Sequence, residues 1–166
     1  MTRRRGFTLL ELLIVVLIVA TLSALSIDLF RTHGEERLQG AARLFRADVE
    51  WARSATLSNP DDPAAIHLMA DGSGWFVARN SSPLVPMTGS DGSEIRRVLG
   101  VDMAQVADGV SIAPSTAGSN KIEFDPFGGV RTGPSSVVLT LPDLQCECLI
   151  TFESDTGLLQ ISYPNP

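Results

Sequence analysis

The first thirty residues divide into a basic start and a long apolar run. Three arginines, Arg3 to Arg5, precede the segment from Phe7 to Ile27, in which Glu11 is the only charged side chain. A helix rises about 1.5 Å per residue, so this segment is long enough to cross the roughly 30 Å hydrocarbon core of a bilayer. The pattern predicts a transmembrane helix over residues 7–27, with the arginines in the cytoplasm by the positive-inside rule.

The apolar positions continue at helical spacing beyond this segment. Spacings of four, three, four and three residues place five side chains on one stripe: Leu38, Ala42, Phe45, Val49 and Ala52. Charged side chains, Asp48 among them, are expected on the other faces. The pattern predicts that residues 28–58 continue the helix as an amphipathic half.

The predicted helix therefore runs from about Phe7 to Leu57 and ends at the proline-containing segment 59–63, because proline cannot continue a helix. Gly34 and Gly40 each cost about 1 kcal/mol relative to alanine in a helix interior. We therefore expect a bend or local unwinding near residues 31–40.

After residue 59 the pattern changes to short strands separated by turn residues. Ile66–Met69 and Trp75–Val77 flank Asp71–Gly74 and predict a hairpin, and residues 80–94 predict a loop. The remaining predicted strands are residues 95–99, 110–113, 121–124, 137–141, 148–152 and 158–163. The expected fold is α+β, a long N-terminal helix packed on an antiparallel β-sheet head formed by residues 59–166.

The chain is acidic, with a formal net charge of −6 at pH 7. Residues 28–166 hold 10 of its 13 basic and 18 of its 19 acidic side chains, a charge of −8 for the part beyond the apolar run. Lys121 is the only lysine, and the pair Arg96 and Arg97 stands alone, with one arginine expected to face solvent from a strand. Such a surface repels phosphate on average, so duplex DNA is not an expected partner.

Glu11 is the feature of the apolar run that needs an explanation. An unpaired acidic residue in a membrane helix costs about 2.5 to 3.5 kcal/mol on insertion scales. A secretory signal peptide, with Ser23 and Ala24 near its cleavage site, would not contain such a charge. A twin-arginine signal matches only weakly, and a plain membrane anchor leaves Gly6 and Glu11 unexplained.

The run from Arg5 to Leu13 resembles the class III leader of type IV pilins and type II secretion pseudopilins. This resemblance implies that residues 1–6 are a leader, which prepilin peptidase removes by cutting between Gly6 and Phe7. Phe7 then becomes the N-methylated first residue. Glu11 becomes the fifth and pairs with the ammonium of Phe7 in a neighbouring subunit, which compensates its charge in the apolar filament core.

Residues further along the chain resemble the GspH/FimT group of minor pseudopilins and minor pilins. The similar stretches are residues 42–55, the hairpin containing Trp75, residues 122–129 and a final hairpin over 150–161. The resemblance implies a minor pseudopilin of a type II secretion system, a structural component that assists protein export across the outer membrane. Two alternatives are a FimT-like minor type IV pilin in pilus assembly or DNA uptake, and a membrane-anchored periplasmic binding domain.

The same resemblance implies the partners and the location of the protein. The partners would be other pilins or pseudopilins, prepilin peptidase, and inner-membrane lipid before assembly. The chain would cross the inner membrane once, with a cytoplasmic N-terminus and a periplasmic head, and would then join a periplasmic pseudopilus.

The polar residues do not form an enzyme motif. The two histidines, His33 and His67, have no cysteine or histidine at ligand spacing, and we expect His67 to be an exposed strand residue. The acidic segments at 71–73 and 90–94 fit turns better than calcium loops. We expect no catalytic residue, no metal site and no cofactor.

Cys146 and Cys148 lie two residues apart in a predicted strand, so both point to one face and Glu147 points to the other. Their Cα atoms would be close to the upper limit for a disulfide, about 7 Å. An oxidising periplasm permits a bridge with a local bend. A reduced buried pair, a strained bridge and transient metal binding all remain open.

Overall fold

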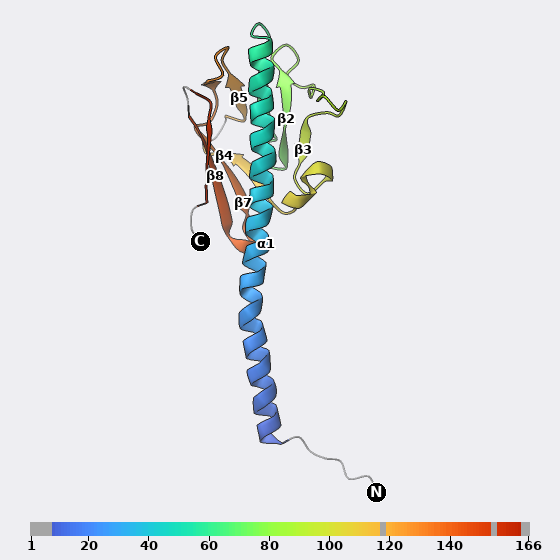
Figure 1. Ribbon diagram of the computed structural model, residues 1–166, viewed down its shortest axis with the longest axis vertical. Coiled ribbons are helices and arrows are strands. Elements are labelled where there is room, and N and C mark those ends of the chain that lie inside the picture. The colour runs from blue at the N-terminus through green and yellow to red at the C-terminus, as the bar shows by residue number, and fades with distance from the viewer. Residues whose placement is uncertain (1–7, 117–118, 154–155, 164–166) are drawn as a thin grey trace.

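The protein consists of one long helix with a β-rich head packed along its C-terminal half (Figure 1). The computed structural model describes residues 8–116, 119–153 and 156–163, with side chains described at all of these positions except 24–33. Helix α1 (Leu9–Ser58) is 50 residues long. The predicted α+β fold is confirmed, and the predicted helix end at Leu57 differs from the observed end by one residue.

Helix α1 continues through residues 31–40 without a break, so the predicted local unwinding is wrong. The two glycines serve close packing instead. A Cβ atom at Gly34 would lie 2.6 Å from Leu144 Cδ1, and one at Gly40 would lie 2.8 Å from Val106 Cγ1. The cost of glycine in the helix is therefore offset by the close approach of two head segments.

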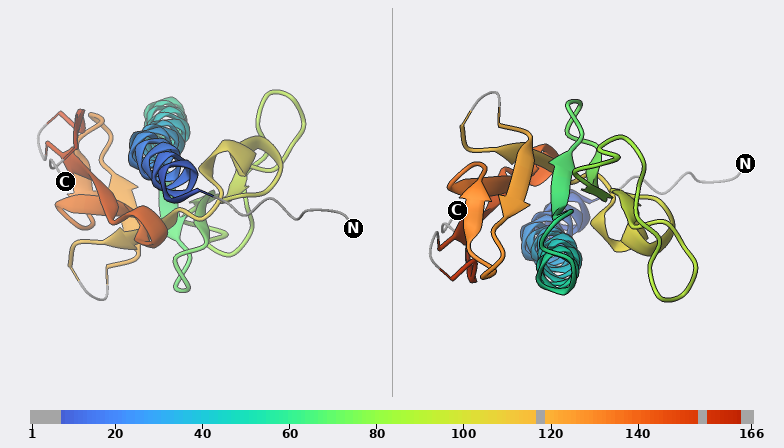
Figure 2. Two further views of the ribbon diagram at one scale, coloured as in Figure 1. Left: turned by 90° about the horizontal axis from the view of Figure 1, so that it is seen from below. Right: turned by 90° about the horizontal axis from the view of Figure 1, so that it is seen from above.

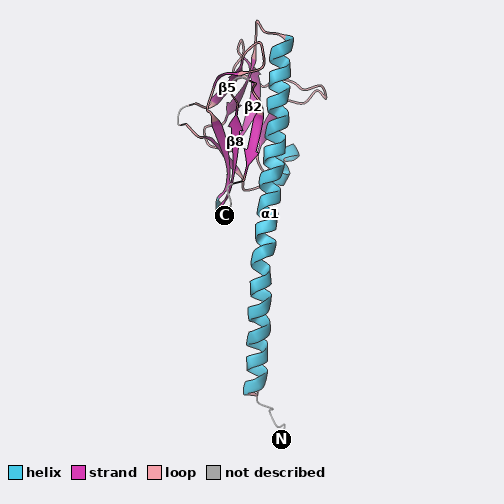
Figure 3. Ribbon diagram, turned by 60° about the vertical axis from the view of Figure 1, so that its left-hand side comes forward, coloured by secondary structure: helices cyan, strands magenta, loops and turns pink. Residues whose placement is uncertain are grey.

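The head contains two antiparallel sheets rather than the one expected (Figures 2 and 3). The five-stranded sheet has the order β3 (Arg96–Val98), β2 (Gly74–Arg79), β1 (Ala64–Leu68), β5 (Lys121–Phe124) and β6 (Val130–Thr132). The four-stranded sheet has the order β4 (Ser111–Pro114), β7 (Ser136–Leu141), β8 (Cys146–Phe152) and β9 (Leu159–Ser162). Helix α1 contacts strands of both sheets and joins them into one core.

Each strand expected from the sequence is present, with boundaries that differ by up to two residues. The hairpin of β1 and β2 pairs Ile66 with Val77, and the final hairpin of β8 and β9 pairs Ile150 with Ile161. The sequence pattern did not indicate three short elements: strand β6 and the 3₁₀ helices η1 (Asp102–Ala107) and η2 (Pro142–Leu144). Each is too short for a hydrophobic period to identify it.

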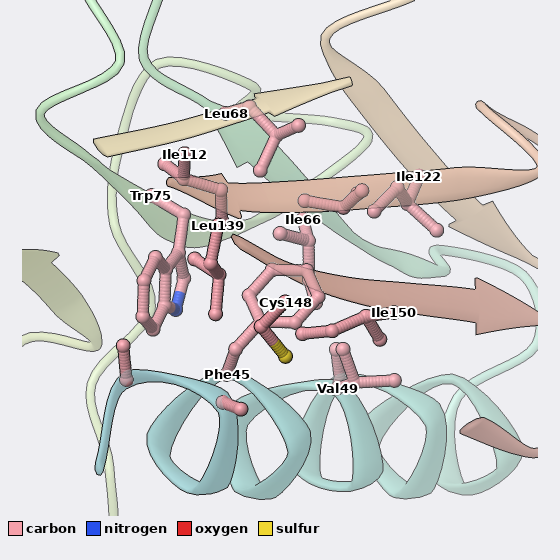
Figure 4. Packing of buried hydrophobic residues seen from close by; sticks show 14 of the residues in the cluster. Phe45, Val49, Ile66, Leu68, Trp75, Ile112, Ile122, Leu139, Cys148 and Ile150 are labelled. Atoms are coloured by element: carbon pink, nitrogen blue, oxygen red, sulfur yellow. The ribbon is translucent and has the colours of Figure 1, made fainter. Parts of the chain in front are cut away.

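The core confirms the predicted helical stripe. Its five members are almost completely inaccessible to solvent: Leu38, Ala42, Phe45, Val49 and Ala52. Phe45 meets Trp75 edge to face, with ring centroids 5.1 Å apart. Around them lie Ile66 and Ile122 from one sheet and Leu139 and Ile150 from the other (Figure 4).

Asp48 is buried, so the predicted distribution of charged residues on the helix is wrong at this position. It was expected on a solvent-facing side, but only 6% of it is exposed. Its carboxylate accepts a hydrogen bond from Trp75 Nε1 at 2.9 Å and two from Arg97, from Nε at 3.0 Å and from Nη2 at 3.2 Å. Because every bond ties α1 to the β2–β3 edge of the sheet, the buried charge fixes how the head sits on the helix.

The C-terminal end of α1 is tied to the head by hydrogen bonds. Thr56 Oγ1 donates to the carbonyl of Ala52 at 3.0 Å and accepts from the backbone N–H of Ala64 at 3.0 Å. Arg79 of β2 donates to the carbonyls of Ala55 and Asp62. The last turn of α1 contains no basic residue of its own, so Arg79 supplies the positive charge that a helix C-terminus favours.

Candidate functional site

The start of α1 is built as a capping box around Glu11. Thr8 is the N-cap, with extended backbone angles of φ −83° and ψ 151°. Its hydroxyl accepts from the Glu11 N–H at 3.3 Å, and Glu11 Oε2 accepts from the Thr8 N–H at 3.5 Å. This reciprocal pair satisfies two of the backbone donors that a helix start leaves free.

The capping box directs the Glu11 carboxylate back toward the N-terminal side of the helix. A carboxylate there also interacts favourably with the positive end of the helix dipole. Gly6 and Phe7, the predicted cleavage and methylation positions, lie outside the described residues. The roles of Gly6, Phe7 and Glu11 in processing and charge pairing stay predictions, and the observed geometry places one of these residues, Glu11.

The helix surface that follows Glu11 is apolar on all sides. Eleven large side chains between Leu9 and Leu22 have exposed fractions from 45% to 84%: Leu9, Leu10, Leu12, Leu13, Ile14, Val15, Val16, Leu17, Ile18, Val19 and Leu22. A helix that is hydrophobic all round needs an apolar environment, either lipid or other protein. The head covers none of these side chains, so their cover must come from outside the described chain.

No helix among the residues with described side chains combines the length and the apolar character needed to cross a membrane. The predicted transmembrane segment, residues 7–27, begins and ends outside those residues.

Two basic side chains of the head are paired with acidic ones. Arg97 is bound to Asp48, and Lys121 is paired with Glu123. Arg96 is exposed, so the expected alternation of the two neighbouring arginines is confirmed. The sequence did not reveal that Arg97 has a buried acidic partner. The available signal was the position of Asp48, which follows Phe45 of the buried stripe by three residues and so lies on the same side of the helix.

His67 is less exposed than the sequence suggested. Its ring stacks on Phe76 with centroids 5.0 Å apart and an 8° angle between the ring planes. Burial lowers its pKa from the ordinary value, and the neighbouring Lys121 lowers the pKa further. The expectation of an exposed strand residue is therefore wrong, because the side chain is half-buried, and the neutral ring belongs to the packing of β1 against β2.

The acidic turn residues cap their own turns, as expected. Asp71 accepts hydrogen bonds from the N–H and the hydroxyl of Ser73, and Asp91 does the same with Ser93. These bonds lower the pKa of both carboxyl groups. Within the described residues, no group of three or more acidic, histidine or cysteine side chains is arranged to hold a metal ion.

Cys146 and Cys148 lie on one face of β8 and are both free thiols. Burial raises the pKa of Cys148 to about 11, partly offset by a hydrogen bond with Tyr163. The Cys146 thiol donates to the Leu144 carbonyl at 3.4 Å, and Glu147 faces solvent on the other side. The structure describes a reduced pair, and a metal or disulfide role for it stays a prediction.

A shallow hollow of about 330 Å³ lies beside the edge strand β3. Its described lining includes Arg96, Arg97 and Met103, and contains neither histidine nor cysteine. The guanidinium of Arg97 is bound to Asp48, which does not belong to the lining. The two acidic side chains of the lining, Glu94 and Asp102, are both exposed.

Comparison with protein families supports the interpretation of the N-terminus. The model of the prokaryotic N-terminal methylation motif matches residues 1–27. No curated protein and no solved structure matches the chain. A leader of this kind implies processing by prepilin peptidase and assembly with other pilins. The chain therefore carries, at residues 1–27, the N-terminal methylation motif of type IV pilin-like proteins, which includes their prepilin leader.

Proposed function

We propose that the protein is a minor pseudopilin of the GspH/FimT type, a structural subunit of a type II secretion pseudopilus and not an enzyme. The observation that carries the proposal is the N-terminal arrangement. The methylation motif at residues 1–27 contains a capping box that holds Glu11 at the start of an apolar helix, and the apolar surface has no cover within the described chain.

The physical argument begins with the charge of Glu11. Among the described residues, its carboxylate accepts one backbone hydrogen bond, from Thr8 at 3.5 Å, which compensates a full charge poorly in an apolar environment. Cleavage after Gly6 would create an ammonium at Phe7. A neighbouring subunit would then bring that ammonium to Glu11, and the apolar surfaces of both helices would cover the pair.

The assembly route follows from the same surfaces. Before assembly, lipid of the inner membrane would cover the apolar half of α1, with the arginines of the leader in the cytoplasm and the head in the periplasm. During assembly, the helices of other pseudopilins would replace the lipid. One surface thus serves both as membrane anchor and as filament core.

The engaged basic side chains favour secretion over DNA uptake. Nucleic-acid binding draws on exposed lysine and arginine clusters. Arg97 and Lys121, two of the basic residues considered for such a cluster, are bound to carboxylates. A role as an isolated periplasmic binding domain is less favoured, because an anchor alone would use Glu11 only to cap the helix, and an uncharged glutamine could cap it as well.

The experiment that tests the proposal compares Glu11→Ala with Leu10→Ala in the full chain in its own host. Leu10 is a neighbouring exposed side chain of the same helix. We expect both variants to reach the membrane and to be processed, and only Glu11→Ala to be lost from the sheared filament fraction. Equal incorporation of the two variants would contradict the assembly role of Glu11.

Processing is tested separately with Gly6→Val, which is expected to block leader removal. Mass spectrometry of the wild-type N-terminus should find N-methylphenylalanine at residue 7. A mature chain starting at any other residue would overturn the pilin-like interpretation.

A further inference from the structure

Cys146 and Cys148 lie on the core-facing side of β8, but solvent reaches them to different extents. The side chain of Cys148 is 0% exposed and lies in the core close to Phe45 (Figure 4). Cys146 is half-buried and packs against the same core. A reagent can therefore reach Cys146 in the folded chain, whereas Cys148 reacts only after a neighbouring group has moved away from it.

Tyr163 is the residue opposite Cys148 in the last hairpin. The register pairs Leu149 with Ser162, so Cys148 and Tyr163 occupy the next pair of opposite positions, directly beyond the end of β9. Opposite residues of an antiparallel pair project to the same face, which here is the face toward α1. The Tyr163 hydroxyl is hydrogen-bonded to the Cys148 thiol. Tyr163 therefore lies over Cys148.

The Tyr163 ring also reaches helix α1. Burial and the neighbouring Cys148 raise the pKa of Tyr163, and the guanidinium of Arg43 on α1 partly offsets the rise. The hydroxyl is thus close to the helix as well as to the thiol, while the side chain as a whole is 45% exposed. Tyr163 forms the outer layer between solvent and Cys148, at the junction of β9 with α1.

The segment that carries Tyr163 is held by few contacts. Within the described chain, β9 lies at the edge of its sheet and pairs with β8 alone, through four residue pairs. A short edge strand opens at a smaller cost in free energy than the core does. Tyr163 can therefore leave its place while the pairing of β7 with β8 stays intact.

A disulfide between the two cysteines requires a change in β8. Residues two apart in a strand have Cα atoms about 7 Å apart, near the upper limit for a bridge, so the strand must bend. On the β7 side, Cys146 is paired with Leu141 and Cys148 with Leu139. While Tyr163 is in place, β8 is held on its other side too, and the bend is resisted. When Tyr163 leaves, that side of β8 is free.

We propose that Cys146 and Cys148 form a redox-sensitive pair and that Tyr163 is its latch. While Tyr163 is in place, only Cys146 exchanges with an external disulfide. Once Tyr163 has left, Cys148 attacks the Cys146 sulfur and closes an internal bridge. Because the bridge keeps β8 bent, it disfavours the return of Tyr163, so the redox state of the pair and the docking of the last strand are coupled.

The chemistry is thiol–disulfide exchange with an external disulfide as the oxidant. The Cys146 thiolate attacks one sulfur of that disulfide and forms a mixed disulfide, and the other sulfur leaves as a thiolate that takes up the proton given up by Cys146. The Cys148 thiolate then attacks the Cys146 sulfur, and the second external thiol leaves with the proton of Cys148. Two cysteines are oxidised and one external disulfide is reduced to two thiols. The proposed periplasmic location would supply such disulfides.

The test treats the full chain in detergent with oxidised glutathione and follows its mass. Wild type should take up one glutathione, at Cys146. Tyr163→Ala should close the internal bridge about tenfold faster than wild type, losing the glutathione, because loss of a hydrogen bond and of packing lowers the cost of local opening. Tyr163→Phe, which keeps the ring, and Leu158→Ala, at an exposed position of the same hairpin, should stay near wild type. Equal rates in wild type and Tyr163→Ala would overturn the latch.

A second measurement keeps the wild-type sequence and therefore does not depend on how a variant folds. In the chain that carries one glutathione, bridge closure should accelerate at urea concentrations below those that change tryptophan fluorescence, to which the buried Trp75 contributes. Cys148→Ser has no second thiol and should keep its glutathione at every urea concentration. If closure in wild type instead follows the fluorescence change, Cys148 is freed only by global unfolding and Tyr163 is not a latch.

Discussion

Helix α1 carries two carboxylates in apolar surroundings, Glu11 and Asp48, and they are satisfied in different ways. Asp48 accepts three hydrogen bonds from Trp75 and Arg97 of its own head. Glu11 accepts one from the part of the chain that the structure describes, donated by the backbone N–H of its own N-cap, Thr8. The comparison teaches that an acid among apolar side chains can mark either an internal contact, as Asp48 does, or a contact that another chain completes, as we propose for Glu11.

The two halves of the helix differ in the same way. Leu38 to Ala52 present one stripe, which the head buries. Leu9 to Leu22 present apolar side chains all round, and nothing in the described chain covers them. The C-terminal half is therefore part of the core of the head, and the N-terminal half is an exposed apolar surface.

Among the changes that test this comparison of the two helix halves, Phe45→Ala should have the largest effect on stability. Removing a fully buried phenylalanine from the core should lower the free energy of unfolding of the head by about 3 to 5 kcal/mol. Leu13→Ala, in the exposed half, should leave it unchanged. Urea unfolding of the full chain in detergent measures both, and a comparable loss in Leu13→Ala would show that the two halves are not independent.

Asp48→Ala should have the next largest effect, about 2 to 4 kcal/mol, because it leaves Arg97 mostly buried without its partner. The double variant Asp48→Ala with Arg97→Met should regain much of that loss, since no unpaired charge remains. Glu50→Ala breaks an exposed pair with Arg46 and should cost at most about 0.5 kcal/mol. Equal losses in Asp48→Ala and the double variant would contradict the role given to the buried ion pair.

A smaller effect should appear in the pH dependence of stability. Because the pKa of His67 is lowered in the folded protein, its contribution is complete above the ordinary pKa near 6.5 and is lost as the pH falls through the folded value. The groups around it are Phe76, Lys121 and Glu123. We expect unfolding midpoints to fall between pH 7 and pH 5 in wild type and to change less in His67→Phe.

The smallest effect concerns the reactivity of a single thiol and leaves the fold unchanged. With its pKa raised from 9.0 to about 11, native Cys148 should react with iodoacetamide about a hundredfold more slowly than the same thiol in urea. Cys146, which is less buried, should be labelled first. Mass spectrometry after alkylation without reductant should find both thiols in the unfolded chain, and their absence there would show a disulfide.

The sequence predicted most of the fold, because its signals were local. A period of 3.6 residues identified the stripe from Leu38 to Ala52, and turn residues separated the strands. The division into two sheets was missed, since it depends on which distant strands pair, such as β1 with β5 and β4 with β7. The predicted unwinding near Gly34 and Gly40 was wrong because the cost of glycine was counted without the packing of Leu144 and Val106.

For the candidate site, the sequence by itself determined the leader, the position of Glu11 and the apolar surface around it. These features depend on the order and spacing of neighbouring residues, which a sequence states directly. The tertiary structure alone decided that Asp48 is buried against Arg97 and that Gly34 and Gly40 lie against Leu144 and Val106. Both depend on where segments far apart in the chain meet, and only the folded chain fixes those distances.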